Sequence, residues 1–138
     1  MKKLVLMIIP LGILLSCGGE ELEEKKETVI PEPEVLVERD GSTHKEYYPG
    51  KKQLKFIGDV DSEERRHGVW RHYSETGLEL STAEYYHGAK NGVTVVKYPN
   101  GRLHYTGEYK NNKRAGVWKT YNPDGSMASE EDYGEGMN

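Results

Sequence analysis

The sequence predicts an all-β fold: an elongated single-layer antiparallel sheet built from about four repeated β-hairpins. The first supporting observation is a period of 24 residues that runs through residues 68–133. Three landmarks keep this period: Gly68, Gly92 and Gly116; Gly77, Gly101 and Gly125; and Tyr85, Tyr109 and Tyr133. A period in this range is typical of proteins that stack one small unit against the next.

Composition is the second observation. Of the 138 residues 35% are hydrophobic, and the aromatic residues are mainly 10 Tyr and 2 Trp, with a single Phe. A two-layer core usually needs more Leu, Ile and Phe, whereas Tyr suits a pleated surface that is dry on one side and wet on the other. The composition therefore favours one exposed sheet.

Turn residues are the third observation. Each unit begins with a strand rich in Val, Trp, Thr and Tyr, expected at residues 69–73, 93–98 and 117–121. A turn follows each, and the last, Asn122-Pro123-Asp124-Gly125, has the residue order of a type I turn. The second strand is clearest at residues 103–109, where polar and apolar residues alternate. We expect the segments 87–91 and 110–115 to be loops that lead to the next unit.

A degenerate unit precedes the three regular ones. Residues 44–50 indicate a strand and a turn, and residues 54–60 match residues 103–109 in the order of residue types. Terminal units of an array are often atypical because one side of them faces water. This gives the fourth hairpin.

The first residues are typical of an export signal. Lys2 and Lys3 precede an apolar run at residues 4–15, which is too short to span a hydrocarbon core of about 30 Å and is suited to a signal peptide. The run ends in Leu14-Leu15-Ser16-Cys17, which resembles the lipobox of bacterial lipoproteins. That resemblance implies a lipoprotein signal peptide at residues 1–16, palmitate and other acyl chains on Cys17, and, with Gly18 next, an outer-membrane location. The alternative is an ordinary signal peptide that ends beside a chance cysteine.

An acidic segment follows the cysteine. Residues 18–40 carry nine acids against three bases and include Pro31-Glu32-Pro33. Without apolar periodicity, we expect residues 17–40 to form a lipid-anchored disordered tether, and residues 41–138 to form the repeat domain. Residues 35–37 are an alternative edge strand. The domain itself carries 14 acids and 14 bases, and a neutral surface predicts no nucleic-acid partner.

The repeat unit also resembles a known family. The segment Gly116-Val117-Trp118-Lys119-Thr120-Tyr121, followed by the turn and a second strand ending in Tyr133, looks like the bacterial MORN-repeat variant of YwqK-type antitoxins. The resemblance covers about residues 44–136 and implies hairpins laid side by side. Thr94 replaces the tryptophan of the middle unit, which would interrupt an aromatic stripe.

No residue pattern indicates catalysis, a cofactor or a metal site. The five histidines, His44, His67, His72, His87 and His104, do not share the 24-residue register. Glu84, Glu108 and Asp132 do share it, but equal register places them about 9 to 10 Å apart, too far to share a proton or a metal ion. No nucleophile motif or phosphate loop is present.

The leading functional hypothesis is a membrane-anchored scaffold that binds a protein or an envelope polymer. Trp70, Tyr73, Trp118 and Tyr121 are the candidate binding surface, because Trp and Tyr often anchor interfaces; alternatively they form ladders within the sheet. A second hypothesis is an antitoxin or immunity protein that binds a toxin directly, which rests on the family resemblance. A third, an enzyme acting on cell-wall glycans, is disfavoured by the spacing of the carboxylates.

Overall fold

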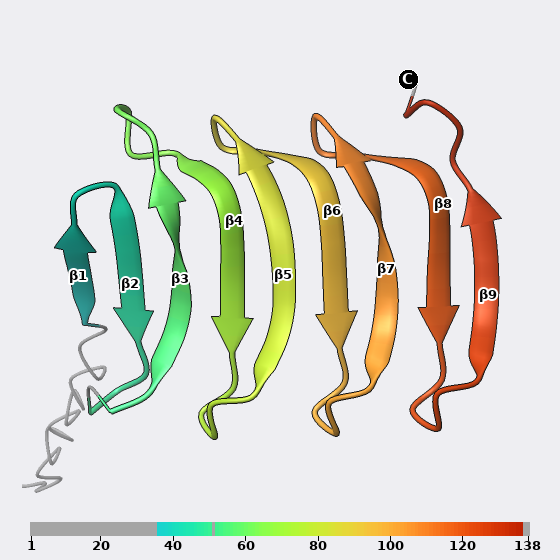
Figure 1. Ribbon diagram of the computed structural model, residues 1–138, viewed down its shortest axis with the longest axis horizontal. Coiled ribbons are helices and arrows are strands. Elements are labelled where there is room, and N and C mark those ends of the chain that lie inside the picture. Colours follow the sequence, from blue (N-terminus) through green and yellow to red (C-terminus); the bar gives the residue numbers. More distant parts are fainter. Residues whose placement is uncertain (1–35, 51, 137–138) are drawn as a thin grey trace, which may run out of the picture. The chain divides into compact units, whose positions relative to one another are not determined.

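The computed structural model describes residues 36–50 and 52–136, and these residues form one antiparallel sheet of nine strands (Figure 1). The strands are β1 Val37–Asp40, β2 Thr43–Tyr47, β3 Leu54–Val60, β4 Arg66–Tyr73, β5 Glu79–Tyr86, β6 Ala89–Lys97, β7 Leu103–Lys110, β8 Lys113–Tyr121 and β9 Met127–Asp132. Each strand pairs with the strand that follows it in the chain, so the order in the sheet is the order in the sequence. The predicted all-β hairpin fold is confirmed.

Both faces of the sheet lack a second layer within the described part of the chain. That part also holds no helix long and apolar enough to cross a bilayer. Few residues are buried: within residues 36–50 and 52–136 these are Trp70, Thr94, Ala115 and Trp118, apart from glycines. Packing within one face of the sheet must therefore do the work of a core.

The turns that follow β4, β6 and β8 have the predicted residues and hydrogen bonds. In the last hairpin the amide of Gly125 donates to the carbonyl of Asn122 at 2.8 Å, which closes the expected four-residue turn. The amides of Gly77 and Gly101 close the same turn in the two preceding hairpins. These glycines have positive φ values of 87°, 82° and 93°, a conformation that glycine adopts without steric cost.

The turns at the other ends of the strands, after β5 and β7, differ from the prediction. The segments 87–91 and 110–115 are not loops: the turns there are only two residues long, at His87-Gly88 and Asn111-Asn112. All four residues have positive φ, the conformation of a type I′ turn, whose twist matches that of the flanking strands. The strands β6 and β8 therefore begin earlier than expected, at Ala89 and Lys113.

The repeated glycines Gly68, Gly92 and Gly116 lie inside strands rather than in turns. Each has positive φ and stands where the register with the preceding strand shifts. Their role is thus to form a bulge in β4, β6 and β8, which increases the local twist of the sheet.

The boundary of the predicted tether was also wrong at its end. Residues 37–40 form β1, whose Glu38 and Arg39 pair with Lys45 and His44 of β2. All four residues of β1 are exposed. Backbone pairing with β2 and an ion pair from Arg39 to Glu64 hold the strand in place. The signal peptide, Cys17 and the tether up to residue 35 lie outside the described residues.

Candidate binding faces of the sheet

One face of the sheet carries nearly all of its buried side chains. Trp70, Thr94 and Trp118 occupy equivalent places on β4, β6 and β8, and their exposed fractions are 5%, 4% and 4%. We call the side they share the tryptophan face. It serves as the core, because no second layer covers it in the described part of the chain.

Each tryptophan lies flat over a glycine of the preceding strand. A Cβ atom at Gly58 would stand 2.4 Å from Cγ of Trp70, and one at Gly107 would stand 2.3 Å from Cδ2 of Trp118. Such distances do not occur between real atoms, so only glycine permits the indole to reach the backbone. The glycine and the tryptophan form one structural pair, which occurs between β3 and β4 and again between β7 and β8.

Both indoles also donate a hydrogen bond to a backbone carbonyl of the preceding strand. Nε1 of Trp70 donates to the carbonyl of Asp59 at 2.7 Å, and Nε1 of Trp118 donates to that of Glu108 at 3.1 Å. In the middle unit Thr94 replaces tryptophan, and its Oγ1 donates to the carbonyl of Thr82 at 3.1 Å. The threonine thus keeps a hydrogen bond to the neighbouring strand although the ring is missing.

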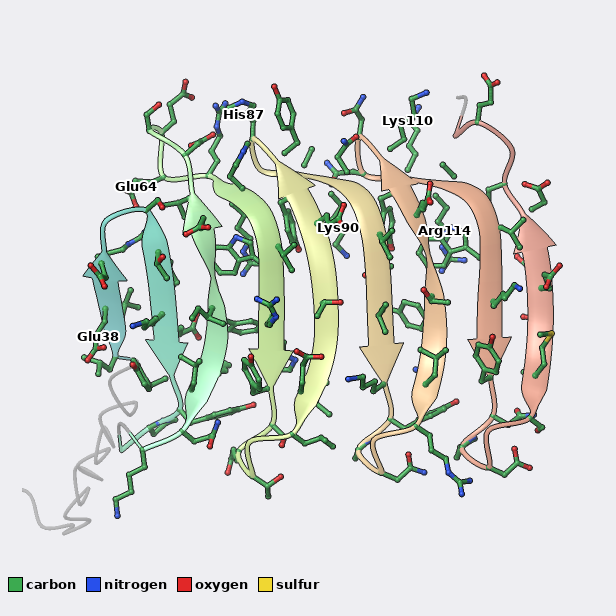
Figure 2. All side chains as sticks on the ribbon, in the orientation of Figure 1. Glu38, Glu64, His87, Lys90, Lys110 and Arg114 are labelled. Carbon is green, nitrogen blue, oxygen red and sulfur yellow. The ribbon has the colours of Figure 1, made fainter. Side chains whose placement is uncertain are left out.

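Cationic side chains cover the rings from outside. Arg66 lies 4.3 Å from the ring centroid of Trp70, and Arg114 lies 4.5 Å from that of Trp118. The equivalent residue of the middle unit is Lys90, whose Nζ lies 4.8 Å from the ring centroid of Tyr109. Figure 2 shows Lys90 and Arg114 at the same level of β6 and β8. The sequence analysis missed this row, although Arg66, Lys90 and Arg114 keep the 24-residue period.

The three repeated tyrosines lie among these cations and rings. Arg114 Nη1 donates to the hydroxyl of Tyr133 at 2.7 Å, and Arg66 Nη1 to that of Tyr85 at 3.3 Å. Tyr109 packs edge to face on Trp118 with centroids 5.0 Å apart. Indoles and cations lie between the tyrosines, which are two strands apart and so would leave gaps without them.

The structure does not bring the four candidate binding residues together on one exposed surface. Trp70 and Trp118 are buried beneath the ring and cation contacts just described, so they offer almost no area to a partner. Tyr73 and Tyr121 each lie three residues further along the strand, and an odd separation points them to the other face. Their carbonyls accept hydrogen bonds from Tyr48 and Tyr98 of the preceding hairpins.

The other face carries a regular exposed row that the sequence analysis did not identify as a surface. Val69 pairs with Glu84, Val93 with Glu108, and Val117 with Asp132. The exposed fractions of the valines are 40%, 42% and 46%. We call these six residues, which alternate across β4–β9, the valine–acid row. The signal was present in the sequence, since both the valines and the acids repeat every 24 residues.

The acids of this row differ in their pairing from other acids on the same face. Glu79 forms ion pairs with Arg71 and Lys97, and Glu130 forms one with Lys119. By contrast none of the ion pairs between residues in 36–50 and 52–136 includes Glu84, Glu108 or Asp132, although the amide of Gly134 donates to Asp132 at 2.8 Å. The row is therefore a line of carboxylates that form no ion pair with a described residue, separated by apolar side chains; Lys119, near Glu108, pairs with Glu130 instead.

A hollow lies within the row. Its lining includes Val93, Glu108 and Val117, together with Thr106 and Lys119, and its volume is about 310 Å³. The hollow is open to solvent and placed over β7, between the valines of the two flanking strands. It can receive a side chain that is apolar along its length and positive at its end.

The histidines are scattered over the sheet. His44 lies near Trp70, His72 stacks on Phe56, and His104 stacks on Tyr98. His67 and His87 are closer, with centroids 5.1 Å apart, and His87 contacts Asp61 at 2.6 Å. Over the described ranges no group of three or more His, Cys, Asp or Glu is placed to hold a metal ion.

Comparison with known proteins agrees with this geometry. The model of a family described as the MORN repeat variant matches residues 90–111 and 114–134, which cover most of β6–β9. The two matches support a MORN-repeat protein, and the hairpin β4–β5 has the same landmarks one period earlier. A search of curated proteins found no match. Repeats of this family generally bind membranes or proteins and are generally not catalytic.

Proposed function

We propose that this protein is a non-catalytic lipoprotein that is held to a membrane by Cys17 and binds a protein or envelope partner through its sheet. The valine–acid row is the observation that carries the proposal. It exposes apolar side chains in a regular line on a face that no other described strand covers. Stable packing is confined to the tryptophan face, so the row has no role in the core and is available for contact.

The anchor is proposed from the sequence. The apolar run at residues 4–15 ends at Cys17, which is the single cysteine of the chain and so has no disulfide partner within it. Each buried methylene of an acyl chain adds about 0.8 kcal/mol of membrane affinity, and two chains give durable attachment. Gly18 after the cysteine favours the outer membrane, and the acidic segment would hold the sheet away from the lipid surface.

Metabolic labelling with an alkyne fatty acid tests the anchor. The wild-type chain is expected to take up label and to sediment with membranes, whereas Cys17→Ala is expected to do neither. Labelling of the variant to the wild-type level, or release of neither protein from the membrane, would refute attachment through Cys17.

Site-specific photocrosslinking in the producing cell tests partner binding. A photoreactive residue in place of Val93 is expected to give discrete adducts with one or a few proteins. The matched control replaces Glu75, which is exposed in the turn between β4 and β5 and lies outside the row. Identical adduct patterns from the two positions would contradict the proposal.

The identity of the crosslinked protein also separates the two binding roles. A structural protein of the envelope supports a scaffold, while a toxin supports an immunity function that uses the same face. Rescue from that toxin by co-expression would then be expected to require the row.

A further inference from the structure

We propose that the valine–acid row binds an extended basic protein segment that presents lysine or arginine at every third residue. This inference rests on the proposed binding function and names the chemistry of the partner. It is drawn from the exposed valines, the carboxylates that form no ion pair with a described residue and the hollow between them.

One place in the row defines the recognition unit. The hollow over β7 is bounded by Val93 and Val117, and Glu108 lies in its lining; Lys119 also lies there, but its ion pair is with Glu130. The methylenes of a lysine or arginine can pack between the two valines while the charged end meets the carboxylate of Glu108. A short polar or an acidic side chain satisfies only one of these two surfaces or neither.

The same arrangement recurs one repeat earlier. Glu84 on β5 stands between Val69 on β4 and Val93 on β6, just as Glu108 stands between Val93 and Val117. Asp132 has a valine on one side only, because β9 is the last strand of the described sheet. The row therefore offers two complete places for a cation and one partial place.

The spacing of these places selects the conformation of the partner. Equivalent residues two strands apart are separated by about 9.6 Å. A polyproline II segment brings every third residue to the same side at about 9.3 Å, while a helix brings every seventh residue to the same side at about 10.5 Å. The mismatch per interval is about 0.3 Å for the extended segment and about 0.9 Å for the helix, so the extended segment matches better.

Charge excludes other occupants of the row. The chain's own segment 18–40 carries nine acids against three bases, so the carboxylates repel it. A second copy that presented the same row would place acid against acid, and an anionic lipid surface would meet the same repulsion. A basic segment alone brings the missing cations.

Two synthetic peptides test the inference against the full chain in neutral detergent. One contains four Lys-Pro-Pro units, and the other has the same composition in two blocks, all lysines before all prolines. Fluorescence anisotropy at low salt is expected to show about fivefold tighter binding of the repeating peptide, since two exposed ion pairs together contribute about 1 kcal/mol. Equal affinity for the two peptides would overturn the inference.

Variants test whether the row is responsible. Glu84→Gln with Glu108→Gln is expected to abolish the preference for the repeating peptide. The matched control is Glu75→Gln with Glu131→Gln, which removes the same charge from a turn and from the strand position opposite Trp118. An equal loss in the control would show a general charge effect and would overturn the inference.

The outcomes also separate this inference from the proposed function. Crosslinked partners at Val93 without any peptide preference would leave the binding function standing and remove the basic extended segment as its ligand. Peptide preference without cellular adducts would support the ligand chemistry and contradict binding of a partner at Val93 in the cell.

Discussion

The smallest unit of this fold is a glycine beneath a tryptophan. In a single sheet an aromatic ring loses most of its solvent contact only if it lies flat on the backbone, and a Cβ in the neighbouring strand prevents that. Gly107 provides the space for Trp118, and Arg114 closes the ring from the other side. Burial of such a ring removes apolar area from water and so stabilises the sheet, where no second layer is present in the described residues to do so.

Gly107→Ala tests this pair. The added methyl would overlap Trp118, and we expect a loss of about 1 to 3 kcal/mol in the free energy of unfolding, the usual cost of overpacking. Urea denaturation followed by tryptophan fluorescence measures it.

A double variant supplies the control for this substitution. Gly107→Ala with Trp118→Thr recreates the Ala83 and Thr94 combination of the middle unit, so the two losses should be less than additive by about 0.5 to 3 kcal/mol. Strict additivity would show that the glycine acts through backbone freedom and not through contact with the ring.

At the scale of the hairpin, three residues change together in the middle unit. Where β4 and β8 carry Arg and Trp beside a Gly of the preceding strand, β6 carries Lys90 and Thr94 beside Ala83 of β5. The physical link is direct, since Ala83 pairs with Thr94 across the strands and leaves no space for an indole. The interrupted aromatic stripe is therefore a coordinated alternative packing of the same hairpin.

Restoring the tryptophan tests this alternative. Thr94→Trp alone is expected to lower the free energy of unfolding by about 1 to 3 kcal/mol because the ring meets Ala83. Thr94→Trp with Ala83→Gly is expected to be at least as stable as the single variant Ala83→Gly, which itself loses about 1 kcal/mol through backbone entropy.

Thermal unfolding of the three variants gives the comparison. If Ala83→Gly makes Thr94→Trp no more stable, the hairpins do not share one packing rule.

At the scale of the whole sheet, polar contacts connect hairpins that are distant in sequence. Asp61, in the loop between β3 and β4, meets His87 in the turn between β5 and β6, and Figure 2 shows His87 and Glu64 along this edge. Burial raises the pKa of Asp61, but hydrogen bonds from His87, from the amides of Arg65 and Glu63 and from the Arg65 side chain outweigh it and hold the pKa well below its usual range.

These groups predict how stability depends on pH. Burial, together with Arg39 for His44 and Lys55 for His72, lowers the pKa of both histidines. Their contribution is complete above an unfolded pKa of about 6.5 and is lost as the pH falls toward their folded values. The contribution of Asp61 is complete above about pH 3.9 and is lost below it.

Urea denaturation over a series of pH values checks this prediction. We expect the free energy of unfolding to fall below about pH 6.5 and to fall again below about pH 4. His44→Gln with His72→Gln should reduce the first decrease, and Asp61→Asn should reduce the second. Wild-type pH dependence in either variant would contradict the assignment.

The sequence by itself determined the repeat, the hairpins and the glycine turns closed by Gly77, Gly101 and Gly125, because local chemistry fixes these features. It also located the acids at Glu84 and Glu108 correctly in register. It misplaced the strands around Gly92 and Gly116, since a glycine with positive φ suits a bulge as well as a turn, and only pairing with a neighbour distinguishes them.

Only the tertiary structure decided which side chains are core and which are surface. Tryptophan is a residue type that often anchors interfaces, yet Trp70 and Trp118 are buried by a glycine on the preceding strand and an arginine above each ring. Valine is a typical core residue, yet the three exposed valines are not covered by any other described strand. Burial depends on which strands become neighbours and on which face a residue points to, and both are settled by pairing across the sheet.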